Sequence, residues 1–338
     1  MGKSSVGVVG YVDQQIDALN THVPAALGAF DAKGIHQARV ATRRLKAALD
    51  LLEPLLHKKE IEPTQKAGKK LRRRLGPLRD LDVMIDHLET LTAPPKLKAS
   101  AAWLRDRLEK SRLQRRQDDY AEGRKPTKLL REFAAWHIAR HSLPDDADAL
   151  TPHVLSTLHE QFDAFVLEAD QVAGVTPPAG DDPIDIHVLR VNGKNLRYTF
   201  EIAVAQDLPV PAHVLKTFKA MQESLGTWHD YVVLAEQALQ ATLEAQLSHH
   251  SPDLAAAKLD LTKLFLNQAG RALSQFSARW RRSAESLTNA LRESVPLTVD
   301  VSTPPAATES QTDLDPPATD APPAPATFPP DDVPDTQV

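Results

Sequence analysis

Apolar residues along most of this chain recur at spacings of three and four rather than two. That spacing places them on one face of an α-helix, and the same segments are rich in Ala, Leu, Lys, Arg and Gln, which favour helices. Sustained alternation of apolar and polar residues, the mark of a half-buried strand, is missing. The pattern therefore predicts an all-α fold. The predicted helical segments lie within 5–30, 35–60, 65–92, 97–140 and most of 148–292.

The composition changes near Glu293. Residues 293–338 contain nine acidic residues, no Lys or Arg, and eleven of the 26 prolines. Such a segment buries too little apolar surface to offset the entropy lost on ordering, so we expect a disordered, acidic, Pro-rich tail. Subtracting its nine negative charges from the net charge of −5 leaves +4 for residues 1–292. The body of the protein is therefore mildly basic.

Length and composition narrow the classes of protein that fit. The 338 residues leave room for two domains. No apolar run approaches the roughly 20 residues that span a bilayer, and the N-terminus lacks the apolar core and cleavage site of a signal peptide. The absence of cysteine excludes disulfides and thiolate chemistry. We therefore expect a cytoplasmic protein with no membrane segment.

Two motifs occur twice along the chain. HQARVATRRLK at 36–46 returns 151 residues later as HVLRVNGKNLR, and LGPLRDLDV at 75–83 returns 150 residues later as LGTWHDYVV. Two motifs that keep their register in this way indicate an internal repeat. We infer two similar helical units related by a pseudo-two-fold axis, followed by the tail. The units are residues 1–147 and 148–292.

The first motif forms a cationic stripe when it is drawn as a helix. Arg39, Arg43 and Lys46 fall within about 80° of His36, whereas the leucines from Leu45 onward fall on the opposite side. Like charges at these spacings destabilise a helix by a few tenths of a kcal/mol per pair, and interleaved acids are largely missing. An uncompensated stripe suits an anion receptor. The second unit repeats the stripe with His187, Arg190, Lys194 and Arg197.

These two motifs resemble those of the CHAD family, the conserved histidine α-helical domain, and the resemblance extends over residues 1–292. The resemblance implies two four-helix bundles about a pseudo-two-fold axis, with a basic central channel that binds inorganic polyphosphate. It also implies an association with polyphosphate granules. The triphosphate-tunnel domain that often accompanies this family, with its strands and ExExK start, has no counterpart in the sequence.

By position, the resemblance assigns the cationic residues of both motifs to the channel. Asn195 stands where the first unit has Arg44, and His229 stands where it has Arg79, so the second unit contributes less charge. Asp80 and Asp230, the acids of the repeated motifs, are expected to orient an Arg or His of the stripe. The motif residues assigned to the channel are His36, Arg39, Arg43, Arg44, Lys46, His187, Arg190, Lys194 and Arg197. Further candidate cations are Lys69, Lys70, Arg72, Arg73, Arg74, Arg79, Arg105, Arg112, Arg115 and Arg116, with Arg271, Arg279, Arg281 and Arg282 in the second unit.

The chemistry of these residues suits polyphosphate. The polymer carries negative charge on every phosphate and has no bases to be read. Arg directs two N–H groups at phosphate oxygens, and Lys adds a point charge. Contacts of this kind displace counterions, so binding is expected to weaken steeply with salt.

Other interpretations of the same residues stay open. A basic run is often only a solvated helix face, and in a structural scaffold the cations would pair with acids across the bundle. His229 and Asp230 suggest a metal-dependent phosphohydrolase. A nucleic-acid binder is a further alternative, although the stripes lack interleaved aromatic residues for base stacking. We predict a non-enzymatic polyphosphate-binding protein that needs no cofactor or metal and contacts neither membrane nor nucleic acid.

Overall fold

The computed structural model describes residues 7–121, 126–144, 146–176, 185–248 and 252–296. Within these ranges the regular elements are α-helices and short 3-10 helices, without a strand, so the predicted all-α fold is confirmed. In the same ranges no helix is long and apolar enough to cross a membrane. The predicted acidic tail lies almost entirely outside the described residues.

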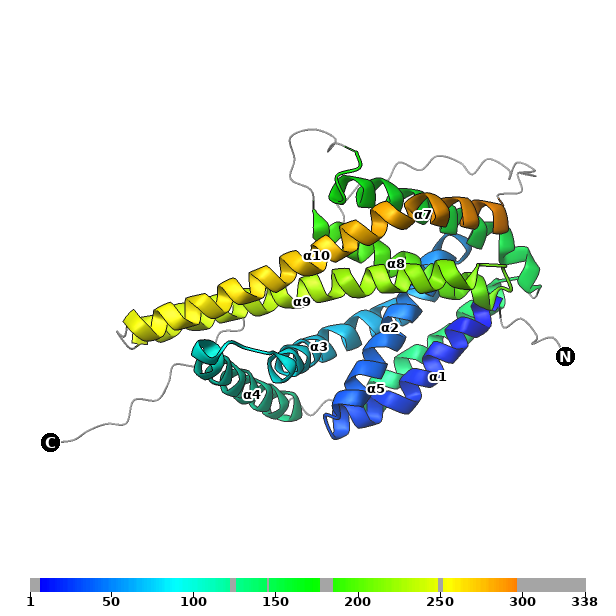
Figure 1. Ribbon diagram of the computed structural model, residues 1–338. Helices are drawn as coiled ribbons and strands as arrows, with labels where there is room; N and C mark the ends of the chain where they lie inside the picture. Colours follow the sequence, from blue (N-terminus) through cyan, green and yellow to red (C-terminus); the bar gives the residue numbers. More distant parts are fainter. Residues whose placement is uncertain (1–6, 122–125, 145, 177–184, 249–251, 297–338) are drawn as a thin grey trace, which may run out of the picture. The chain divides into compact units, whose positions relative to one another are not determined.

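The long helices follow the order that the repeat suggests (Figure 1). The first part of the chain forms α1 (Gly7–Gly28), α2 (Ala32–Leu52), η1 (Glu53–Leu55), α3 (Lys58–Thr90), η2 (Pro95–Leu97) and α4 (Lys98–Ala121). Short α-helices and 3-10 helices follow as α5 (Pro126–Arg131), η3 (Glu132–Ala135), α6 (Trp136–Ala139), η4 (Arg140–Ser142) and η5 (Ala147–Leu150). The second part forms α7 (Thr151–Val172), α8 (Ile186–Ala205), α9 (Ala212–Ser248) and α10 (Pro252–Ser294).

Three helix boundaries differ from the sequence pattern. The helix predicted at 35–60 already ends at Leu52, and a 3-10 helix follows it over Glu53–Leu55. The helix predicted at 65–92 already begins at Lys58, and it includes Pro63 and Pro77, which donate no main-chain hydrogen bond. The segment predicted as helical over 97–140 is divided, because α4 ends at Ala121 and a new short helix starts at Pro126. Proline favours the first turn of a helix, since the N–H that it lacks has no partner there.

An aspartate caps the start of each motif helix. Asp31 precedes α2, and its carboxylate accepts a hydrogen bond from the main-chain N–H of Gly34 at 2.6 Å. Asp185 precedes α8 and accepts hydrogen bonds from the N–H groups of His187 at 2.8 Å and Val188 at 3.3 Å. These bonds satisfy N–H groups that have no partner inside the helix, so they stabilise the helix starts that carry the motifs.

Equivalent helices of the two parts have equivalent partners. α1 packs on α2 as α7 packs on α8, α2 on α3 as α8 on α9, and α3 on α4 as α9 on α10. Figure 1 shows α9 and α10 side by side as a long antiparallel pair. Across the two parts α2 contacts α8, α3 contacts α9 and α4 contacts α10. A two-fold arrangement would produce these contacts, and the axis itself stays a prediction.

The leucine side of each motif helix faces the core. Leu45, Leu49 and Leu52 of α2 are at most 1% exposed, and Leu189 and Leu196 of α8 are fully buried. Burying side chains of this size stabilises a fold by about 1.5–3 kcal/mol each. Burial of this face therefore fixes the rotation of α2 and α8 about their own axes. Their cationic sides then face away from the apolar core.

The larger apolar core is shared by both predicted units. Phe165 of α7 belongs to the same cluster of buried side chains as Trp136 and Trp280. The indole N–H of Trp136 donates to Asp13 at 2.8 Å, and that of Trp280 donates to Asp170 at 2.7 Å. A buried indole N–H needs such an acceptor, so both tryptophans are satisfied core residues.

A smaller core joins the far ends of the two helix pairs α3–α4 and α9–α10. Met84 of α3 and Leu104 of α4 are buried there against Leu234 of α9 and Phe265 of α10. This contact holds α3 against α9, the two helices that carry the second repeated motif.

Candidate functional site

The cationic sides of the two motif helices meet, because α2 packs against α8. Burial lowers the pKa of Arg190 and of Lys194 on α8, and the positive charges of Arg43 and Arg39 on α2 lower both further. The four cations are therefore close enough to repel one another. The central cluster is defined here as Arg39, Arg43, Arg190 and Lys194 with Asp80 of α3 and Asp230 of α9.

The cations of the central cluster are partly buried. The side chain of Arg39 is only 13% exposed, and burial lowers its pKa to about 10 even though Asp80 opposes the shift. Burial likewise lowers the pKa of Arg190 to about 10. Both guanidinium groups therefore stay charged at neutral pH. Burial and the adjacent Arg190 hold the pKa of Lys194 well below its usual range.

Several donors of the central cluster have no acceptor. Among the residues that the structure describes, the side chains of Arg43, Arg190 and Lys194 take part in no hydrogen bond or ion pair, and the Nε atom of Arg190 is buried. Buried donors are usually hydrogen-bonded, and leaving one unpaired costs about 1–3 kcal/mol. An anion with several oxygens would satisfy these groups.

Asp80 compensates part of this charge. Its Oδ1 atom accepts a hydrogen bond from Nη2 of Arg39 at 3.4 Å. Burial raises the pKa of Asp80, while the charges of Arg39 and Arg43 act in the opposite direction. Asp80 therefore contacts an arginine of the stripe.

Asp230 has a partner that the sequence did not suggest. Its Oδ2 atom lies 3.3 Å from Nε2 of His87 on α3. Burial acts to raise the pKa of Asp230, but the hydrogen bond and charge of His87 bring it below its usual value. His87 follows Asp80 by seven residues, which returns to nearly the same side of a helix. That spacing is the signal that places His87 on the side of α3 that carries Asp80, but it does not identify Asp230 as its partner.

Three histidines lie at the edge of the central cluster. The rings of His187 and His229 are 5.8 Å apart. Burial, then the charge of Arg190, lowers the pKa of His229 to about 3. Burial and the charges of Arg79, Arg43 and Arg39 also lower the pKa of His36. In the described part of the chain, no three His, Asp or Glu residues gather as metal ligands would.

Three residues assigned to the channel by resemblance are paired with acids outside the central cluster. Nε of Arg44 donates to Oε2 of Glu201 at 2.6 Å, and Arg197 lies 3.8 Å from the same carboxylate. Lys46 pairs with Asp50 on its own helix. Because Arg44 is on α2 and Glu201 is on α8, their ion pair ties the two motif helices together.

Two further predicted cations lie beside the central cluster. Arg72 of α3 donates to the main-chain oxygen of Thr42 at 3.0 Å, and its charge contributes to the lowered pKa of Arg39. Arg79 lies 4.0 Å from Asp86, and its charge acts on His36. Both extend the positive surface of the central cluster along α3.

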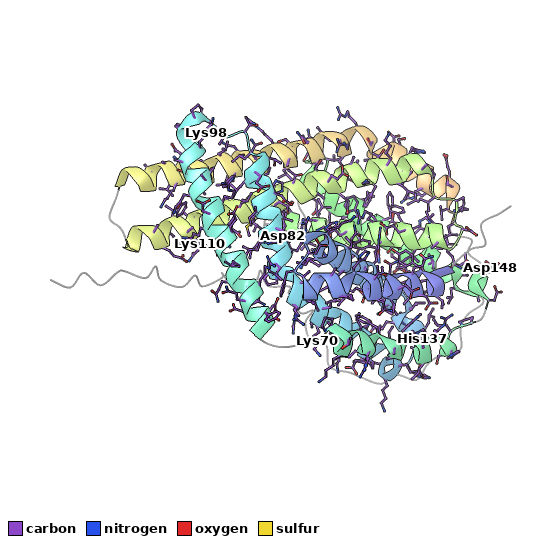
Figure 2. The ribbon with its side chains drawn as sticks, turned by 90° about the horizontal axis from the view of Figure 1, so that it is seen from below. Lys70, Asp82, Lys98, Lys110, His137 and Asp148 are labelled. Atoms are coloured by element: carbon purple, nitrogen blue, oxygen red, sulfur yellow. The ribbon has the colours of Figure 1, made fainter. Side chains whose placement is uncertain are left out.

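The remaining predicted cations lie outside the central cluster. Arg112 of α4 pairs with the buried carboxylate of Asp82, where α3 runs beside α4 (Figure 2). The guanidinium of Arg116 lies 5.4 Å from the ring centroid of Phe30. Lys69 and Arg73 line a separate pocket between α3 and α4.

Comparisons with known proteins agree with this arrangement of helices. A model of the CHAD domain family matches residues 10–239. Two uncharacterized proteins from strains of Mycobacterium tuberculosis are each 29% identical over 230 residues, which cover 64% of this chain and 42% of theirs. The chain thus spans less than half the length of these curated relatives. The crystal structure of the CHAD domain from the plant Ricinus communis is similar in fold, with a TM-score of 0.53 and 21% identity over 86% of this chain and 91% of that one.

Proposed function

The chain belongs to the CHAD domain family, and we propose that it binds inorganic polyphosphate at the central cluster without altering it chemically. One observation carries this proposal. Four cations from α2 and α8 converge against only two carboxylates, and three of those cations have no side-chain partner among the described residues. This arrangement leaves an excess of positive charge in a half-buried place.

A linear polyanion suits this arrangement better than a single small anion. The cations come from two helices and continue along α3 through Arg72 and Arg79. A guanidinium directs two N–H groups at phosphate oxygens, and such charged hydrogen bonds contribute about 1.5–3 kcal/mol each. A polymer that contacts several of these groups binds with higher affinity, and the protein needs no group that recognises nucleic-acid bases.

We propose binding rather than hydrolysis. The carboxylates of the central cluster are engaged with Arg39 and His87, so neither is poised next to a free site as a general base. His229 lies among positive charges that also oppose the approach of a metal cation. By family resemblance we further propose that the protein is cytoplasmic and associates with polyphosphate granules.

A titration of the full chain tests this function. Fluorescently labelled long-chain polyphosphate is compared with single-stranded DNA of matched charge, each at two salt concentrations. We expect polyphosphate to bind more tightly, with log affinity falling by about three per log unit of salt if four cations each neutralise a phosphate. Equal binding of DNA would make the protein a general polyanion binder. Release of orthophosphate during the incubation would contradict the non-enzymatic proposal.

A further inference from the structure

A second basic site lies between α3 and α4, separate from the central cluster. It is a pocket of about 510 Å³, which we name the α3–α4 pocket. Figure 2 labels Lys70, one of the residues of α3 that line it. Its lining residues are Lys66, Lys69, Lys70, Arg73, Arg74, Arg115 and Asp119.

Helix geometry explains why these residues gather. Lys66, Lys69, Lys70 and Arg73 recur at spacings of three and four, so they share one side of α3. Arg115 and Asp119 are four residues apart on α4 and likewise share a side. The two sides face each other where α3 packs on α4.

The acids near the pocket compensate only part of its charge. Lys66 pairs with Glu62 at 2.8 Å, and Lys70 pairs with Glu132 at 2.9 Å, in largely exposed ion pairs. Exposed pairs of this kind are weak and are screened by salt. Arg74 lies 3.6 Å from the buried Asp119.

The other cations of the pocket have no such partner. Within the described part of the chain, the side chains of Lys69, Arg73 and Arg115 make no hydrogen bond or ion pair, and Nε of Arg115 is buried. Three uncommitted cations around one concavity repel each other unless an anion enters. The pocket therefore has the character of an anion site in its own right.

Helix α3 connects the pocket with the central cluster. Arg72 acts on Arg39 in the central cluster, whereas its neighbour Arg73 lines the pocket. Consecutive Cα atoms are 3.8 Å apart, and an α-helix with its side chains is about 10–12 Å wide. A polyanion that leaves the central cluster therefore needs to cross only about one helix width to reach the pocket.

We propose that the α3–α4 pocket binds a second segment of the same linear polyphosphate that occupies the central cluster. The inference rests on the proposed function and adds to it a dependence on polymer length. When one polymer reaches both sites, the second contact is intramolecular, and the overall affinity exceeds that of either site. A short oligomer fills only one site and gains nothing from the other.

The test compares tripolyphosphate with long-chain polyphosphate on the full chain. The variant Lys69→Gln/Arg73→Gln/Arg115→Gln removes the uncommitted charges of the pocket, and Lys69→Arg/Arg73→Lys/Arg115→Lys retains them. We expect the first variant to bind long chains at least about tenfold more weakly than the parent. Its affinity for tripolyphosphate should change much less, and the charge-retaining variant should keep the preference for long chains.

Other outcomes would overturn the inference in recognisable ways. If the neutral variant keeps the full preference for long chains, the pocket is not a second site, while the proposed function stands. If affinity for both lengths falls equally in a folded variant, the pocket and the central cluster are one site. If the parent binds neither length, the proposed function itself fails. Should the triple variant not fold, Lys69→Gln/Arg73→Gln replaces only exposed side chains and answers the same question.

Discussion

Gly76 of α3 makes room for Arg39 of α2, because a Cβ atom at position 76 would lie 2.9 Å from Nη1 of that arginine. At the equivalent Gly226 of α9, nothing lies within 4 Å of such an atom. The two glycines hold the same place in the sequence repeat, but only at the first would a side chain meet a cation of the central cluster. The close approach of Arg39 to α3 therefore depends on the missing side chain.

This difference predicts different results for the same substitution at the two positions. Replacing Gly by Ala inside a helix stabilises it by about 0.5–1 kcal/mol, and Gly226→Ala should show that gain. Gly76→Ala should gain less and should weaken polyphosphate binding, because Arg39 has to move away from Asp80. Thermal unfolding and a binding titration on both variants check this. Equal stability and affinity for the two would show that Arg39 has ample space.

Removing the charge of Asp80 should strengthen polyphosphate binding. Asn at this position keeps an oxygen that accepts a hydrogen bond from Arg39, but it no longer neutralises the cations. We expect Asp80→Asn to gain about 1 kcal/mol in binding at low salt, with a smaller gain at high salt. Asp163→Asn is the matched control, since that exposed carboxylate pairs with Arg292 at the surface. Weaker binding of Asp80→Asn would mean that the carboxylate charge is needed to hold Arg39 in place.

The neutral state of His229 should make folding sensitive to acid. Its pKa is about 3 in the folded protein, below the ordinary value of 6.5, so between these values the unfolded chain takes up a proton that the folded protein excludes. The contribution of this pKa difference to the free energy of unfolding is fully present above pH 6.5, and it is lost as the pH falls toward 3. Urea unfolding at several pH values should show a shallower loss for His229→Gln than for the parent. Identical pH profiles would place His229 in an environment that does not disfavour its charge.

Binding of a polyanion should be accompanied by proton uptake. Burial and neighbouring cations lower the pKa values of His36 and His229, and a bound polyphosphate adds negative charge beside them. Their pKa values should then rise, so protons are taken up from the buffer. Calorimetric titrations in two buffers with different heats of ionisation measure the number of protons taken up on binding. Proton release on binding would contradict the proposal that polyphosphate binds at the central cluster.

The sequence was sufficient for the parts of the site that depend on helix periodicity. The leucine sides of α2 and α8 are buried as predicted, and this places Arg39, Arg43, Arg190 and Lys194 on sides that meet. Periodicity within one helix carries this information, because the core fixes the rotation of an amphipathic helix.

Contacts between distant segments were beyond the sequence pattern. Arg44, which the resemblance assigns to the channel, pairs with Glu201, which lies 157 residues later. The pairing of His87 with Asp230 spans 143 residues. No spacing within a single helix reveals such partners, since they depend on how α2 packs on α8 and α3 on α9.

The most direct test of the central claim removes two cations that have no side-chain partner in the described structure, through Arg43→Gln/Arg190→Gln. The control Lys219→Gln/Arg292→Gln removes the same charge from exposed positions. Affinity for long-chain polyphosphate is measured for both, together with the free energy of unfolding. The account predicts that the first variant stays as stable as the parent and loses about 1.5–3 kcal/mol of binding for each charged hydrogen bond removed, while the control binds almost normally. A folded Arg43→Gln/Arg190→Gln protein that binds long-chain polyphosphate as tightly as the parent would contradict it.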